Sequence, residues 1–331
     1  MLPLVAERIG SRWDVPAGLR TGLSTEARRY AAFDVARETE LRRLLTAFEA
    51  QGVQAVLFKG AHLAYSHYAR PDLRPRADTD FFIAHADRRR VFDVLGALGY
   101  QGTGHVTGTL VMYQAAYVKR RDGAPWHVVD VHWKIANPQI FADLLSYDEL
   151  AAAAVPLPAL GPGALGLSDL HALVVACVHR VAHHHDADTL IWLYDIHLLA
   201  SRMTPASWET FVDLVETRGV ARICRHSLER AAAEFGTRLP ASVAAEPQVR
   251  QPIKEMMTGT YLNRGRPHFE EVVGDLRALR RWRDRLQLVA QHAFPSAEYM
   301  RGHYAPSSHA PLAILYARRA IHGARKWLAR S

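Results

Sequence analysis

The sequence has few cysteines and no long uncharged run of apolar residues, and each absence excludes a class of protein. Among 331 residues only Cys177 and Cys224 are cysteines, too few for a disulfide framework or a cysteine-based zinc site. No apolar stretch reaches the ~20 residues that a membrane-spanning helix needs. The first residues contain an early acid and arginine and no apolar signal-peptide core. We therefore expect a soluble, reduced, cytoplasmic protein without a membrane span.

Positive charge is concentrated near the end of the chain. Residues 251–331 contain 14 Lys or Arg and 6 Asp or Glu, which accounts for the whole net charge of +8. Two segments there, 276–289 and 308–330, have helical apolar spacing. We expect their apolar stripes to pack on the rest of the protein and their arginines to face water, with non-specific nucleic-acid binding as the alternative. The stripes are Leu276, Leu279, Trp282 and Leu286, and then Ile314, Ala317, Ile321, Ala324 and Leu328. Arg318, His322, Arg325 and Lys326 lie on or near the opposite side of the last helix.

The order of apolar patterns predicts an α+β protein in which a small mixed sheet precedes an all-helical domain. We expect helices at 25–51 (capped by Ser24), 60–68 and 87–98, and strands at 53–58, 79–84, 109–119 and 126–135. The last two strands form a hairpin at residues 121–123, and the helices cover one side of the sheet. Further helices are expected at 168–185, 188–201, 207–218, 220–236, 248–262, 269–293 and 308–330. The predicted divisions are 1–24, 25–150, a linker at 151–167 that is rich in Ala, Pro and Gly, and 168–331.

Two aspartates at the start of an apolar strand are the first candidate site residues. Asp78 and Asp80 are two residues apart and precede Phe81-Phe82-Ile83. Because side chains alternate along a strand, both carboxylates point the same way. Two like charges held this close repel each other unless a cation neutralises them. Ligation by oxygen alone favours Mg²⁺ or Mn²⁺ over zinc.

A third carboxylate, Asp130, lies within the alternating run 127–133. Val129, Val131 and Trp133 share one face of this predicted strand, and Asp130 and His132 share the other. A carboxylate within a strand is costly to bury without a partner. We expect a trio of carboxylates on adjacent strands that binds two divalent ions and stabilises an in-line displacement at phosphorus.

These motifs resemble the bacterial "uncharacterised nucleotidyltransferase" family of the DNA polymerase β-like superfamily. The resemblance covers roughly residues 25–200 and rests on Leu57-Phe58-Lys59-Gly60, Arg74 and Arg76, Asp78-Thr79-Asp80, Asp130-Val131-His132-Trp133, and the later pieces Cys177-Val178-His179, His183 and Trp192-Leu193-Tyr194-Asp195. One position departs from the superfamily, in which many members have Gly-Gly or Gly-Ser where this chain has Lys59-Gly60.

The resemblance implies an enzyme that moves NMP from an NTP to an acceptor hydroxyl or phosphate, with Mg²⁺ or Mn²⁺ as cofactor. ATP is the expected nucleotide, and the acceptor is left open among a small molecule, a peptide, a protein and tRNA. It assigns the metals and catalysis to Asp78, Asp80 and Asp130. It assigns nucleotide binding to Lys59, Gly60, Arg74, Arg76 and His132.

A histidine-rich segment supports a different interpretation. His179 and His183 are four residues apart on a predicted helix, and His184, His185 and Asp186 follow. With Asp195 they could form the metal site of a His/Asp phosphohydrolase. Histidines at the end of a helix also complement its dipole without binding any metal. A non-catalytic RNA-binding protein that uses the basic C-terminal helices is the remaining alternative.

Overall fold

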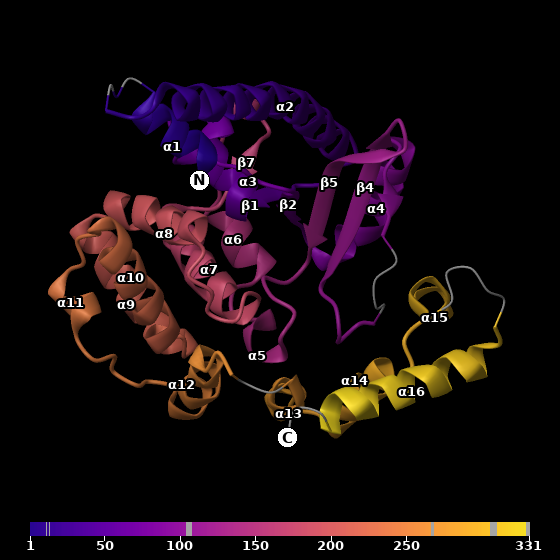
Figure 1. Cartoon of the computed structure of the whole chain (residues 1–331). Helices are drawn as coiled ribbons and strands as arrows, with labels where there is room; N and C mark the ends of the chain where they lie inside the picture. Colours follow the sequence, from indigo (N-terminus) through magenta and orange to yellow (C-terminus); the bar gives the residue numbers. More distant parts are fainter. Residues whose placement is uncertain (11, 13, 104–107, 266–267, 305–309, 329–331) are drawn as a thin grey trace.

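A mixed seven-stranded sheet forms the centre of the N-terminal half (Figure 1). The computed structural model describes residues 1–331 except 11, 13, 104–107, 266–267, 305–309 and 329–331. The strand order is β3-β4-β5-β2-β1-β7-β6. The strands span Val56–Phe58 (β1), Thr79–Phe82 (β2), Gln101–Gly102 (β3), Gln114–Arg121 (β4), Ala124–His132 (β5), Val155–Pro156 (β6) and Leu165–Gly166 (β7). The α+β prediction is confirmed, because the helices beyond β7 are joined by no further strand within the described residues.

The pairing of the central strands sets the position of the candidate site residues. β2 is antiparallel to β1 and parallel to β5. β4 and β5 form the predicted hairpin, and its turn residues Asp122 and Gly123 have φ of 51° and 78°. Two consecutive residues with positive φ are typical of the tight turn that matches strand twist. The observed strands are shorter than predicted, since β1 begins at Val56 and β4 at Gln114.

Helices cover both faces of the sheet, whereas the sequence predicted helices on one face only. On one face α2 (Ala17–Ala50) and α4 (Arg88–Ala97) pack over Leu57, Phe81, Val129 and Val131. On the other face Val56, Phe58 and Phe82 join the large core of the helical half. Alternation along β2 and β5 therefore directs Asp80, Asp130 and His132 toward the helical half.

The long helix α2 begins earlier than the predicted helix at 25–51. It starts at Ala17, after Pro16, so the predicted cap Ser24 lies inside it. Two glycines in residues 17–24 weaken the local helical signal, but α1 (Leu2–Ile9) packs along this part of α2 and supports it. The short helix α3 (Lys59–Ser66) follows β1 directly. The segment 151–167 connects the two halves and also completes the sheet, because its strand β7 lies parallel to β1.

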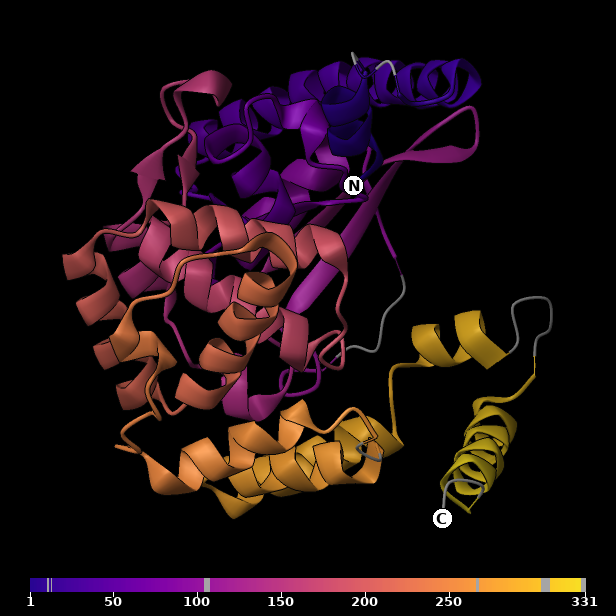
Figure 2. The same ribbon diagram turned by 60° about the vertical axis from the view of Figure 1, so that its left-hand side comes forward.

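The C-terminal half consists of helices (Figures 1 and 2). Ser168 and Thr204 cap α7 (Asp169–Ala182) and α9 (Pro205–Arg218) by accepting hydrogen bonds from the amides of His171 and Ser207. None of the described helices is long and apolar enough to cross a membrane. Shorter elements are α5 (Gln139–Ala142), α6 (Tyr147–Ala152), η1 (Pro71–Leu73), η2 (His85–Asp87), η3 (Pro158–Leu160) and η4 (Thr260–Leu262). The helices after β7 are α7 (Asp169–Ala182), α8 (Leu190–Arg202), α9 (Pro205–Arg218), α10 (Ala221–Phe235), α11 (Ala241–Ala244), α12 (Pro252–Gly259), α13 (His268–Ala278), α14 (Trp282–Ala293), α15 (Ala297–Tyr304) and α16 (Leu312–Leu328).

The prediction that the last apolar stripes pack on the helical half is wrong for their exposed members in α14 and α16, whereas Leu276 and Leu279 are half-buried. Trp282 and Leu286 of α14 are 65% and 59% exposed, and Ile314 and Ile321 of α16 are 48% and 58% exposed. These helices bury Leu288 and Leu315 instead, so each is rotated relative to the predicted orientation. The helix predicted at 269–293 is also interrupted between α13 and α14. The side chains of His322, Ala324, Arg325, Lys326 and Leu328 lie outside the described residues.

Candidate metal and nucleotide site

The parallel pairing of β2 and β5 places two of the predicted carboxylates side by side. Asp80 and Asp130 are direct register partners. Asp78 immediately precedes β2, and all three aspartates line one cavity of about 420 Å³ between the sheet and the helical half. The two strands therefore bring together the three carboxylates that the sequence singled out, in a space large enough for a small-molecule ligand.

Asp80, Asp130 and His132 form a compact group of ligands. Each offers one ligand atom, and these atoms lie within 4.8 Å of one another. His132 Nε2 is 2.9 Å from Asp80 Oδ1. Within the described part of the chain this is the one group of three or more such residues that could hold a metal ion. The resemblance assigns His132 to nucleotide binding, and its place among the ligand atoms is not predicted by it.

The three carboxylates differ in their electrostatic surroundings. Burial and the negative charges of Asp80 and Asp78 raise the pKa of Asp130 to about 7. Burial and the charge of Asp80 also raise the pKa of Asp78. Burial alone would raise the pKa of Asp80, but Lys59 and His132 outweigh it and hold that pKa at about 2. The cluster thus concentrates more negative charge than its one nearby lysine neutralises, which is the situation that a divalent cation relieves.

The carboxylates of the site fit a hard divalent ion, because carboxylate oxygens are the ligands that Mg²⁺ and Mn²⁺ prefer. The nitrogen of His132 departs from the expected ligation by oxygen alone, since imidazole is a ligand more typical of zinc, iron or copper. Burial and the charge of Lys59 lower the pKa of His132 to about 4. Its imidazole is therefore neutral near pH 7 and keeps the lone pair that a ligand needs.

Lys59 connects the end of β1 to the carboxylates. Its Nζ lies 2.8 Å from Asp80 Oδ1 and 3.4 Å from His132 Nε2. Its φ of 54° lies in the left-handed region, which favours glycine. The backbone at Lys59 thus has a conformation suited to glycine, while the side chain supplies a positive charge beside Asp80. Gly60 follows at the start of α3, and a Cβ there would lie 3.1–3.2 Å from the guanidinium of Arg74.

The two arginines before Asp78 are buried and paired with other protein groups. Arg74 donates to both carboxylate oxygens of Asp195 in α8, at distances of 2.8–3.1 Å. Arg76 Nη2 lies 2.6 Å from Asp34 in α2 and 3.2 Å from the hydroxyl of Tyr65. Both arginines line the cavity, and their pairs fix the loop before β2 to helices on either side. No local sequence pattern indicates these partners, because Asp34 and Asp195 are far away along the chain.

A histidine wall, made of His179, His183 and His184, lines the opposite side of the same cavity together with Trp192. The rings of His179 and His183 stack with centroids 5.2 Å apart, and those of His184 and Trp192 with centroids 3.9 Å apart. Nε2 of His183 is buried and has no hydrogen-bond partner among the described residues. Burial, followed by the charge of Lys59, lowers the pKa of His183 to about 3.

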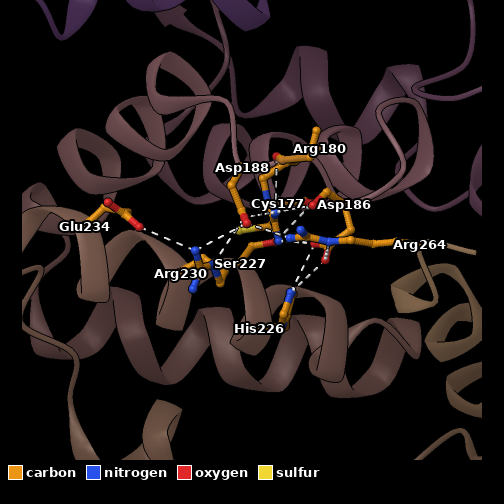
Figure 3. A network of polar contacts seen from close by, with 10 residues as sticks. Cys177, Arg180, Asp186, Asp188, His226, Ser227, Arg230, Glu234 and Arg264 are labelled. Atoms are coloured by element: carbon orange, nitrogen blue, oxygen red, sulfur yellow. Dashed lines mark hydrogen bonds and ion pairs between the residues drawn. The ribbon is translucent and has the colours of Figure 1, made fainter.

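The acids needed for a His/Asp phosphohydrolase site are held by other residues. Asp195 accepts hydrogen bonds from Arg74 and from the hydroxyl of Tyr68. Asp186 is 2.5 Å from the fully buried guanidinium of Arg180 and is also bound by His226 and Arg264 (Figure 3). These contacts anchor the loop after α7, which carries His183 and His184 of the histidine wall. In the structure Asp186 and Asp195 are therefore ion-pair partners of arginines, whereas the phosphohydrolase interpretation required acids at these positions as metal ligands.

One comparison with known proteins identifies a relationship. A family model described as "Uncharacterised nucleotidyltransferase" matches residues 1–236, a range that contains the carboxylates, Lys59, the arginine loop and the histidine wall. None of the curated proteins matches the chain. The helices after α10 lie beyond the matched range.

Proposed function

The chain belongs to this family of uncharacterised nucleotidyltransferases, and we propose from that premise that it transfers NMP from an NTP to an acceptor in a reaction that depends on a divalent metal. An acceptor oxygen attacks the α-phosphorus, a new P–O bond forms, and the bond to the leaving pyrophosphate breaks. The acceptor proton passes to a carboxylate of the site. The observation that supports this proposal most strongly is the convergence of Asp78, Asp80 and Asp130 in one cavity.

Asp78, Asp80 and Asp130 would hold Mg²⁺ or Mn²⁺, with His132 beside them. When bound, the ion neutralises the charge of the phosphates and polarises the bond that breaks. Asp130 lines the cavity next to Asp80 and is the residue that we assign to accepting the acceptor proton. These assignments rest on position, because catalysis of this kind depends mainly on orientation and charge neutralisation.

Lys59 and the start of α3 are placed to meet the triphosphate. The ammonium lies at the carboxylate cluster, and the first amides of α3 form a helix N-terminus, which favours anions. Gly60 leaves room for the close approach of the guanidinium of Arg74. Arg74 and Arg76, whose charges are paired with Asp195 and Asp34, then act by keeping the loop before Asp78 in place. In this arrangement residues 25–150 carry the metals, and residues 168–331 contribute the wall that covers the nucleotide.

The aromatic part of the wall suggests where the base lies. Trp192 lines the cavity and stacks on His184, and aromatic side chains of this kind stack well on nucleobases. ATP is the expected nucleotide. The acceptor remains one of four classes: a small molecule, a peptide, a protein or tRNA.

Transfer from the α-position of the nucleotide tests the proposal. The protein is incubated with Mg²⁺ and each of the four NTPs, labelled at either the α- or the γ-phosphate, with pools of metabolites, peptides and tRNA as acceptors. We expect α-label in the product, unlabelled product from γ-labelled NTP, and pyrophosphate release. Asp80→Asn should abolish transfer, and Asp93→Asn, a change at an exposed carboxylate of α4, should not. Product labelled only from the γ-phosphate would contradict the proposal and indicate a kinase.

A further inference from the structure

A second cavity lies beside the carboxylate cavity. It has a volume of about 910 Å³ and is bounded by α2, by the loop at 75–77 and by Arg121 at the end of β4. Pro75, Arg76 and Ala77 line both cavities. The loop that separates them leads directly into Asp78, the first of the site carboxylates. A molecule bound in the second cavity is therefore separated from the reacting phosphate by a single loop.

The second cavity is positively charged. Arg29, Arg37 and Arg121 line it, and Glu26 is the acidic residue among its lining residues. Glu26 lies 3.8 Å from Arg29 and offsets a single charge. Arg76 also lines the cavity, but its charge is compensated by Asp34. The remaining guanidinium groups attract an anion, and guanidinium groups suit a carboxylate or a phosphate through two parallel hydrogen bonds.

The same cavity exposes aromatic surface. Tyr30 and Phe33 of α2 line it and are 39% and 40% exposed. The guanidinium of Arg37 lies 4.4 Å from the centroid of the Phe33 ring, and Arg37 donates a hydrogen bond to the backbone carbonyl of Arg76. This contact fixes the aromatic ring of α2 next to the shared loop. Aromatic rings beside arginines bind ligands that have a flat or apolar part attached to an anionic group.

We infer that the second cavity is the acceptor site and that it takes a small molecule with a carboxylate or phosphate attached to an aromatic or apolar body. The inference rests on the proposed function, because only a transferase needs an acceptor beside its nucleotide. The anionic group binds the arginines, the apolar body lies against Tyr30 and Phe33, and the nucleophile passes the 75–77 loop toward the α-phosphorus.

Binding of model anions tests this assignment. The probes are 1-naphthyl phosphate, 1-naphthoate and the neutral 1-naphthylmethanol, titrated calorimetrically into the full-length protein with saturating Mg²⁺ and a non-hydrolysable ATP analogue. The variants are Arg121→Glu and Phe33→Ala, with Arg89→Glu and Leu19→Ala as matched exposed changes outside the cavity. We expect at least one anionic probe to bind the wild type and both controls. Its Kd should rise about tenfold in each cavity variant, which corresponds to a loss of about 1.4 kcal/mol of binding free energy. The neutral probe should bind far more weakly.

The outcome also identifies the anion and separates this inference from the proposed function. Binding of the phosphate probe alone, or of the carboxylate probe alone, tells which group the acceptor carries. If neither anion binds, if the cavity variants bind like the controls, or if the nucleotide analogue displaces the probe, the acceptor assignment is wrong. Nucleotide binding is measured separately in every variant. A wild type that binds nucleotide but neither anionic probe would overturn only this inference, whereas a wild type that binds no nucleotide would overturn the proposed function as well.

Discussion

Replacing Asp130 by asparagine should stabilise the protein at high pH when no metal is present. Asp130 is packed among Asp78 and Asp80, and burial together with those charges raises its pKa from 3.8 to about 7. Between these two values the native state keeps the Asp130 proton while the unfolded chain has released it. The wild type therefore loses stability as the pH rises through this window. Asparagine has nearly the same shape and carries no charge, so the variant avoids this loss.

The size of the effect follows from the two pKa values. A difference between 3.8 and about 7 corresponds to about 4 kcal/mol at pH 8. Asp130 is only partly buried, so solvent screening and local relaxation should reduce the gain to about 2 kcal/mol. At pH 5 most of the range between the two pKa values lies above the pH of the experiment. The variant should therefore exceed the wild type in free energy of unfolding by less than about 1 kcal/mol.

Urea unfolding at pH 5 and pH 8 measures this difference, first in EDTA and then in 10 mM Mg²⁺. Asp93→Asn serves as the control, because that carboxylate is exposed on α4. Mg²⁺ that binds the native state stabilises the wild type by mass action. It should stabilise Asp130→Asn much less, so that in Mg²⁺ the wild type becomes the more stable of the two proteins. A variant that is less stable than the wild type at pH 8 in EDTA would refute the electrostatic account, and so would equal responses to Mg²⁺.

Three further substitutions have defined outcomes. Arg180→Met should lower the free energy of unfolding by about 3 kcal/mol in urea titrations, since it leaves the buried carboxylate of Asp186 without its closest cation. As the control, Arg230→Met removes a side chain that is 35% exposed and should lower the free energy of unfolding by less than about 1 kcal/mol. Lys59→Gly should lower the free energy of unfolding in urea titrations, because losing the ion pair with buried Asp80 outweighs the relief of about 1 kcal/mol of backbone strain at a φ of 54°. It should also weaken nucleotide binding in calorimetric titrations with Mg²⁺, and unchanged binding would remove Lys59 from the site. Gly60→Ala should place a methyl group 3.1–3.2 Å from the guanidinium of Arg74 and lower the thermal midpoint, and an unchanged midpoint would show that Arg74 moves aside freely.

The sequence predicts the part of the site that depends on strand periodicity. Val129 and Val131 alternate with Asp130 and His132, and the structure buries the valines on one face of the sheet and directs the polar pair to the other. The same reasoning predicts a common direction for Asp78 and Asp80, and both residues line the carboxylate cavity. Alternation along a strand is a local property, so it can be read from a few consecutive residues.

Features that depend on distant partners could not be predicted in this way. The pairing of Arg74 with Asp195 joins residues 121 positions apart, and no local pattern indicates it. β7 has two residues, too few for any periodicity, and it becomes a strand because β1 offers it a parallel edge. The exposed positions of Trp282 and Ile321 likewise depend on which face of each helix meets the body. An apolar stripe in the sequence predicts that a helix has one apolar and one polar face, but it does not predict which face packs against the rest of the protein.

Anomalous diffraction from crystals soaked with Mn²⁺ and a non-hydrolysable ATP analogue tests the central claim most directly. The account predicts a manganese peak among the carboxylates of Asp78, Asp80 and Asp130, with the triphosphate reaching Lys59 and the start of α3. A peak among His179, His183 and His184, with the aspartates free of metal, would contradict it and assign the metal chemistry to the histidine wall.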